Sequence, residues 1–159
     1  TTENVDLVHA ARAGDAELVA EVLRRFANVN SYEPGKMRTA LHAACKHATE
    51  GPSYLQVCRM LVAAKADVEL PTTDGARMRP LHLAAAEGSM PAVVLLLSAR
   101  ADAAAPNADG QNAAGVAQSH GHKRIAQRLY TTLAQHASDS GVQFPSAELV
   151  LACSRGDLP

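Results

Sequence analysis

The sequence of 159 residues contains no tryptophan and only five other aromatic residues, three Tyr and two Phe. Its three cysteines are too few and too scattered for a disulfide framework. The longest clean apolar run, residues 92–97, is far shorter than the roughly 18–20 residues of a membrane-spanning helix. The formal charge of −1 provides no bulk attraction to nucleic acid or to a membrane surface. Together these absences argue against a secreted disulfide-rich scaffold and a membrane-spanning protein.

Small apolar side chains are what the sequence has in abundance. Hydrophobic residues make up 47% of the chain, and 32 of them are alanines. A protein of this length buries roughly 68–70% of its unfolded surface, which is enough for a core without cross-links. The composition therefore argues against a disordered chain, and it predicts a core in which elements approach closely through alanine.

The sequence also repeats itself. The motif LHAA at Leu41–Ala44 recurs as LHLAA at Leu81–Ala85, and each copy is followed by a second apolar segment and an Ala-Asp pair. A related copy begins at Leu7 (LVHAARAGD), and a weaker one begins at Ala113. Repeats of this size bury their apolar faces only by stacking on neighbours. Four units are therefore predicted, each made of two short helices and a turn.

The two central copies carry a family signature, because Thr39–Ala44 reads TALHAA and Arg79–Ala84 reads RPLHLA. In these segments the chain resembles the ankyrin repeat family, in which TPLHxA opens a repeat of about 33 residues. The resemblance covers about residues 3–137. It implies an all-α ankyrin-repeat solenoid of stacked helix-turn-helix units with hairpin loops. It also implies structural roles for His42 and His82.

The array is predicted to occupy residues 1–137. The four repeats are expected at about 3–31, 32–70, 71–106 and 107–137. From Leu41 to Leu81 the spacing is 40 residues, seven more than the family period of about 33. Two extra residues are predicted in the hairpin before Pro80, and five in the segment Ala48–Ser53. Because Gly-Pro does not continue a helix, this segment is predicted to be a loop at the edge of the stack.

Residues 138–159 are predicted to form a linker turn followed by the first helix of a fifth repeat. The segment LVLACSRGD, which begins at Leu149, matches LVHAARAGD of the first copy. This match predicts that the chain is part of a longer protein. The alternative is a capping helix that ends the array.

No metal, cofactor or catalytic site is expected. A zinc site needs four ligands at coherent spacing, and the seven histidines and three cysteines include no C-x2-C or H-x3-H pair. Cys45 and Cys153 occupy alanine positions of the repeat, and Cys58 lies on the apolar face of a second helix. A thiol at such positions is predicted to act as a small apolar side chain.

The hairpins before the second and third repeats carry a methionine between basic residues, as KMR at residues 36–38 and RMR at residues 77–79. Arginine binds carboxylates through paired hydrogen bonds, and methionine makes adaptable apolar contacts. We therefore consider a recognition patch; the alternative is two solvated turns. The candidate partner-binding residues are Tyr32, Lys36, Met37, Arg38, Arg77, Met78 and Arg79 of the hairpins and Lys46, His47 and Glu87 of the inner helices.

The expected function is that of an intracellular scaffold or adaptor, cytoplasmic or nuclear, with no enzyme activity and no small-molecule substrate. It is expected to bind another protein, through an acidic or mixed segment, on its concave hairpin and inner-helix face. The alternative is a regulatory or targeting domain of a larger enzyme or effector. Nucleic-acid binding is disfavoured by the charge of −1 and by the lack of stacking aromatic residues beside the basic tips.

Overall fold

The structure is a computed structural model that describes residues 2–25, 27–33, 35 and 37–139. Within these residues the chain forms eight helices, in four consecutive pairs, and no strand. The helices are α1 (Thr2–Ala13), α2 (Ala16–Arg24), α3 (Ala40–Lys46), α4 (Pro52–Ala63), α5 (Pro80–Ala86), α6 (Met90–Ser98), α7 (Ala113–Ser119) and α8 (Lys123–Asp139). The predicted all-α class is confirmed.

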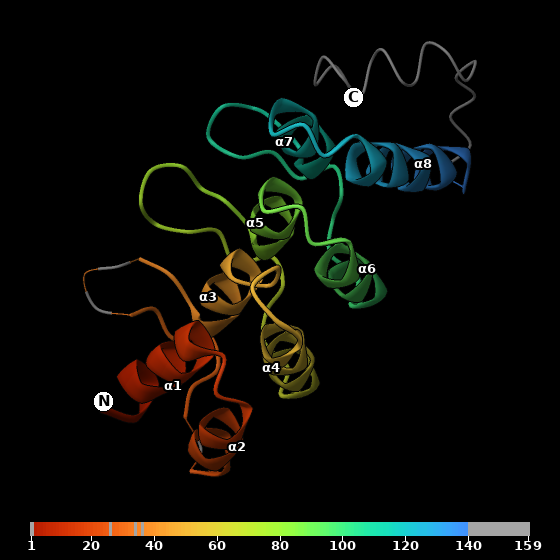
Figure 1. Cartoon of the computed structure of the whole chain (residues 1–159). Helices are drawn as coiled ribbons and strands as arrows, with labels where there is room; N and C mark the ends of the chain where they lie inside the picture. The colour runs from red at the N-terminus through yellow and green to blue at the C-terminus, as the bar shows by residue number, and fades with distance from the viewer. Residues whose placement is uncertain (1, 26, 34, 36, 140–159) are drawn as a thin grey trace.

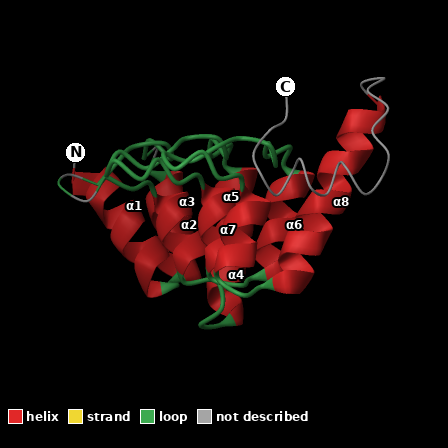
Figure 2. Ribbon diagram, turned by 90° about the horizontal axis from the view of Figure 1, so that it is seen from above, coloured by secondary structure: helices red, strands yellow, loops and turns green. Residues whose placement is uncertain are grey.

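The helices form two layers (Figure 1). The odd-numbered helices form an inner layer in which α1 packs on α3, α3 on α5 and α5 on α7. The even-numbered helices lie beside them, and long hairpin loops extend from the inner layer on its other side. Figure 2 shows the hairpins along one edge of the stack and the short turns within each helix pair along the opposite edge. This arrangement places the hairpins of successive repeats side by side.

Histidine side chains fix where the two central inner helices begin. The backbone N–H of Thr39 donates to His42 Nδ1 over 3.2 Å, and the Thr39 hydroxyl lies 2.8 Å from the same nitrogen. In the next repeat the backbone N–H of Arg79 donates to His82 Nδ1, also over 3.2 Å. Because the first N–H groups of a helix have no partner within the helix, such side-chain acceptors define its start. The structural role that the family resemblance implied for both histidines is confirmed.

Two glycines allow neighbouring repeats to approach closely. Gly88 has a φ of +80°, and a Cβ atom there would lie 2.5 Å from the imidazole of His122 in the following repeat. That imidazole lies against the turn, with His122 Nε2 3.0 Å from the carbonyl oxygen of Ala86. Gly14 has a φ of +69°, and its Cβ would lie 3.0 Å from the Tyr54 ring. Both positions therefore need glycine for backbone conformation and for space.

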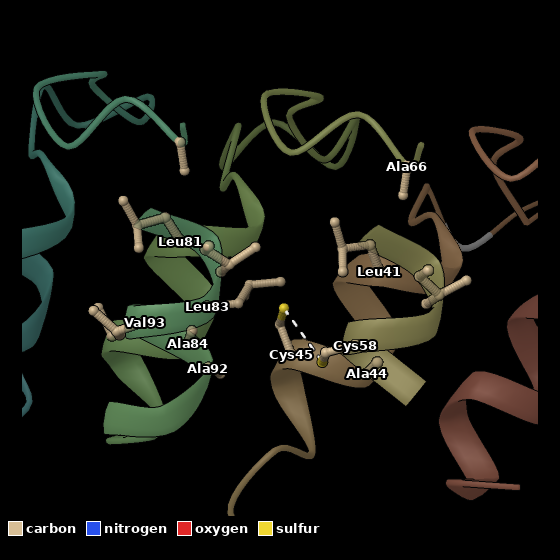
Figure 3. Packing of buried hydrophobic residues seen from close by; sticks show 14 of the residues in the cluster. Leu41, Ala44, Cys45, Cys58, Ala66, Leu81, Leu83, Ala84, Ala92 and Val93 are labelled. Carbon is tan, nitrogen blue, oxygen red and sulfur yellow. Dashed lines mark hydrogen bonds between the residues drawn. The ribbon is translucent and has the colours of Figure 1, made fainter. Parts of the chain in front are cut away.

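The core runs continuously through the four repeats and is built from Leu, Val and Ala. Figure 3 shows it around α3 to α6, where Ala44 and Ala84 are fully buried. The buried Sγ atoms of Cys45 and Cys58 lie 3.9 Å apart. The hydrogen bond with Cys58, together with burial, raises the pKa of the Cys45 thiol. The Cys45 thiol therefore stays protonated, and both buried cysteine side chains pack as apolar groups, as predicted, while Cys153 lies outside the described residues.

The prediction of an edge loop at Ala48–Ser53 is wrong in its second half. Helix α4 begins at Pro52, so Pro52 and Ser53 belong to its first turn. Proline is favourable at this position because its fixed φ suits a helix and its missing N–H would have had no partner there. As a result α4 has 12 residues, whereas α6 has 9. Much of the insertion is therefore an extra turn of helix.

The last described helix, α8, runs to Asp139, two residues past the expected end of the fourth repeat. The predicted fifth repeat or capping helix falls on residues 140–159 and so lies outside the described residues. Among the helices that are described, none combines the length and the apolar character needed to cross a membrane.

Candidate functional site

Each hairpin is closed by one backbone hydrogen bond at its base. The closing bonds run from Glu33 N–H to Arg38 O (2.9 Å), from Thr72 N–H to Met78 O (2.8 Å) and from Asn107 N–H to Gln111 O (2.9 Å). We call these segments the first, second and third hairpins. Relative to the third hairpin, the chain spacing makes the first one residue longer and the second two residues longer. The predicted two-residue insertion before Pro80 is therefore confirmed.

The closing bonds also correct the alignment of the two basic tips. Arg38 and Met78 both accept the closing bond, so they occupy equivalent positions. Met37 and Arg77 are equivalent in turn, with φ of +57° and +50°, and the third hairpin has Gly110 at this position with φ of +75°. The expected match of KMR to RMR is thus out of step by one residue. The sequence motif aligned Met37 with Met78. The N-cap residues Thr39 and Arg79 are equivalent instead, and they align Met37 with Arg77.

Three of the predicted partner-binding residues are engaged within the stack. Met78 is half-buried against the core, and Asn107 Nδ2 donates to its sulfur over 3.6 Å. Arg79 donates to the carbonyl oxygens of Glu69 (3.2 Å) and Pro106 (2.8 Å) and pairs with the Glu69 carboxylate. The Tyr32 hydroxyl donates to the carbonyl oxygen of Pro71 over 2.8 Å. These side chains link one repeat to the next.

Other predicted residues remain on the surface. Met37 is 44% exposed, and Arg77 is exposed on the neighbouring hairpin. Both have a left-handed backbone, which favours glycine and is uncommon for side chains of this size. Glu87 is exposed at the end of α5. Lys36 lies outside the described residues.

A groove of about 410 Å³ brings three predicted residues together with residues that the sequence did not single out. We call it the basic groove; it is lined by Arg12, Arg38, Ala43, Lys46, His47 and Asp74. Arg12 occupies the repeat position of Lys46, so comparing the first copy with the second could have identified it. Asp74 carries no such signal, because an aspartate before glycine is an ordinary turn residue.

The charged groups of the basic groove differ in how firmly they are paired. Arg12 pairs with Glu33, which is only 4% exposed and also lies 3.1 Å from His9 Nε2. Arg38 Nη2 lies 3.8 Å from Asp74 Oδ2, and both side chains are about one-third exposed. Among the described residues, no carboxylate oxygen lies within ion-pair distance of Lys46.

Asp74 and His47 are held in place by neighbours on their own segments. Asp74 Oδ1 accepts hydrogen bonds from the Thr72 hydroxyl (2.6 Å) and from the Ala76 N–H (3.2 Å). Chiefly the Thr72 hydrogen bond holds the pKa of Asp74 below its usual value, so the carboxylate is ionised at neutral pH. His47 Nδ1 lies 2.7 Å from Glu50 Oε1, and this hydrogen bond lowers the pKa of Glu50.

The residues that the structure describes include no cluster of three or more His, Cys, Asp or Glu side chains arranged to hold a metal ion. His42 and His82 are buried, and desolvation lowers the pKa of each to about 4. Both imidazoles are therefore neutral at physiological pH and serve the helix starts described above. The basic groove presents charged side chains and hydrogen-bond donors at the surface.

Comparison with protein families agrees with this architecture. Residues 37–73 match the ankyrin repeat, and residues 81–129 match ankyrin repeats in many copies. Comparison with curated proteins gives no match. Ankyrin repeats are generally protein–protein interaction modules, and domains built from them are typically non-catalytic. With both matches falling on the stacked helix pairs, and with TPLH-type histidines at the helix starts, this chain belongs to the ankyrin repeat family.

Proposed function

We propose that this array binds a partner protein on its concave face, made by the hairpins and the inner helices, and that the bound segment is acidic or of mixed charge. The observation that carries the proposal is the basic groove, where Arg38, Lys46 and His47 come together from a hairpin and from α3. The exposed side chains of Met37 and Arg77 extend the same face along the hairpins. Repeat arrays commonly bind partners along such extended surfaces.

The chemistry of this face suits a peptide segment better than a small molecule. The basic groove is lined by partly exposed charged side chains and by one alanine, whereas small-molecule sites are mostly apolar and aromatic. Arginine and lysine on a rigid frame attract acidic partners over a distance and select them by charge. Met37 adds an apolar contact that adapts to different side chains.

The test is selection of ligands from a random-peptide display library, followed by titration calorimetry of the selected peptides. Binding should weaken about tenfold or more when Lys46→Glu and Arg77→Glu are combined, because two attractive charges become repulsive. The loss should shrink as salt rises, since salt screens exposed charges. Melting curves of each variant monitor folding.

The control is Arg59→Glu, which makes the same kind of charge change on an exposed position of the outer helix α4. It should leave the affinity of the selected peptides nearly unchanged. The proposal would be contradicted if the Lys46 and Arg77 changes left the affinity of the selected peptides unchanged while Arg59→Glu reduced it. The binding surface would then lie elsewhere.

A further inference from the structure

Among the residues that the structure describes, the basic groove has one more positive charge than the carboxylates paired with its arginines balance. Arg12, Arg38 and Lys46 are fixed cations, while Glu33 and Asp74 are the carboxylates that pair with the two arginines. His47 is left out of this count because its imidazole pairs with the Glu50 carboxylate. The unmatched charge belongs to Lys46, at the last position of α3. A ligand with a single negative charge would therefore complete the groove.

The two arginines differ in whether a ligand can reach them. Glu33 is only 4% exposed and forms an ion pair with Arg12, so this pair is shielded from a ligand. Asp74 is 33% exposed and lies 3.8 Å from Arg38 Nη2, at the outer limit of an ion pair. The Arg38 guanidinium therefore keeps donors that another carboxylate can take, and paired N–H donors suit a carboxylate well.

Hydrogen bonds within its own hairpin hold the Asp74 carboxylate in place beside Arg38. Its Oδ1 is tied to Thr72 and to the Ala76 N–H in its own hairpin. Only Oδ2 faces Arg38. The hairpin thus presents a negative charge at a fixed place beside the arginine, where an incoming acidic side chain would also lie.

We propose that one glutamate or aspartate side chain of an extended partner segment binds between Arg38 and Lys46, and that Asp74 is a built-in competitor for Arg38 that limits the affinity. This inference rests on the proposed function and specifies its ligand. Asp74 acts in two ways: it occupies part of the Arg38 donor set, and it repels the incoming carboxylate. A phosphate group fits less well, because its second negative charge would exceed the one unmatched positive charge and would face Asp74.

The decisive variant is Asp74→Asn, because it should improve binding, and a damaged fold does not improve binding. Asparagine keeps an oxygen for the Thr72 and Ala76 hydrogen bonds and removes only the charge. The probe is a fluorescein-labelled peptide of alternating Ser and Glu, titrated at low salt by fluorescence anisotropy. Asp74→Asn should tighten its binding about two- to fivefold, the change that an ion pair of this exposure is worth.

Two controls make the result specific. Asp109→Asn removes the same charge from an exposed position on the third hairpin, and it should change the affinity less than Asp74→Asn does. Lys46→Gln should weaken binding of the Ser-Glu peptide severalfold or more. A matched peptide of Ser and Gln should bind far more weakly than the Ser-Glu peptide.

Several outcomes would overturn the inference: equal effects of Asp74→Asn and Asp109→Asn, equal binding of the Glu and Gln peptides, or tighter binding of a phosphoserine peptide than of the Glu peptide. The Ser-Glu peptide could fail to bind while display-selected peptides still depend on Lys46 and Arg77. In that case the carboxylate site is wrong and the protein-binding face stands. If the selected peptides bind elsewhere as well, both proposals fail.

Discussion

His42 and His82 occupy the same position in consecutive repeats, and both are buried. In each, Nδ1 accepts a backbone N–H, so the ring proton resides on Nε2. His82 Nε2 lies 3.1 Å from the carbonyl oxygen of Gln111, its acceptor, whereas His42 Nε2 has no described group at good hydrogen-bond geometry and has only the backbone of Leu70 and Met78 nearby. Burial lowers the pKa of both from 6.5 to about 4. The same position is thus fully satisfied in one repeat and only partly in the other.

These histidines predict a loss of stability in mild acid. The unfolded chain binds protons near pH 6.5, while the folded chain resists them down to about pH 4. Their stabilising contribution is therefore complete above pH 6.5 and is lost as the pH falls towards 4. Each histidine should remove roughly 1–2 kcal/mol from the free energy of unfolding between pH 7 and pH 5. The double variant His42→Gln with His82→Gln should show a flatter dependence in urea unfolding; parallel curves for variant and wild type would contradict this.

At the scale of the element, helix α4 shows how an insertion is absorbed. Its extra N-terminal turn brings Tyr54 onto the α1–α2 turn, where the ring packs on Gly14. The Tyr54 ring also lies 5.7 Å, centroid to centroid, from the imidazole of His47. The insertion therefore joins the first repeat to the second. Because Pro52 and Ser53 form the helical turn that precedes Tyr54, we expect the helical part of the insertion to contribute to stability.

The packing of Tyr54 predicts that Tyr54→Ala destabilises the fold by roughly 1–2 kcal/mol, in line with the loss of a half-buried aromatic side chain. For a chain of this size that corresponds to a fall in Tm of about 2–4 °C per kcal/mol. Gln56→Ala, at an exposed position of the same helix, is the control and should leave Tm nearly unchanged. Equal Tm values for the two variants would show that the packing of Tyr54 on the first repeat does not stabilise the fold.

At the scale of the whole molecule, stability comes from contacts between neighbouring repeats. The apolar cluster is continuous from the first repeat to the fourth, and each inner helix packs on the next. Short helices cannot bury their apolar faces alone, so each repeat depends on its neighbours. Buried alanines set how closely the inner helices approach, because a packed interior has no room for larger groups.

Close packing at these alanines predicts that Ala84→Leu costs about 1–3 kcal/mol, because extra methylene groups in a packed core force side chains and backbone apart. Ala84 is fully buried in α5, which packs between α3 and α7. The control Ala13→Leu lies at an exposed position at the end of α1 and should change the urea midpoint little. An unchanged midpoint for Ala84→Leu would mean that the inner layer is loosely packed.

Much of this protein follows from its sequence alone. The Leu-His-Ala motifs and the apolar segments after them located the helix pairs, because helix starts and apolar faces depend on residues three or four positions apart. The same repeat positions placed Lys46 and His47 on the inner-helix face. Such patterns involve residues close together in the chain, so they can be recognised in the sequence without knowledge of the fold.

Only the tertiary structure decided which charged side chains meet. The Arg79 guanidinium reaches the base of the next hairpin and donates a hydrogen bond to the Pro106 carbonyl oxygen. Arg12 and Asp74 line one groove although they belong to the first and third repeats. The length of each hairpin set which residue faces the stack, and so it turned Met78 inward and left Arg77 exposed. These outcomes depend on contacts between repeats that are tens of residues apart along the chain. No local pattern encodes such contacts, because stacking distances and loop lengths determine them.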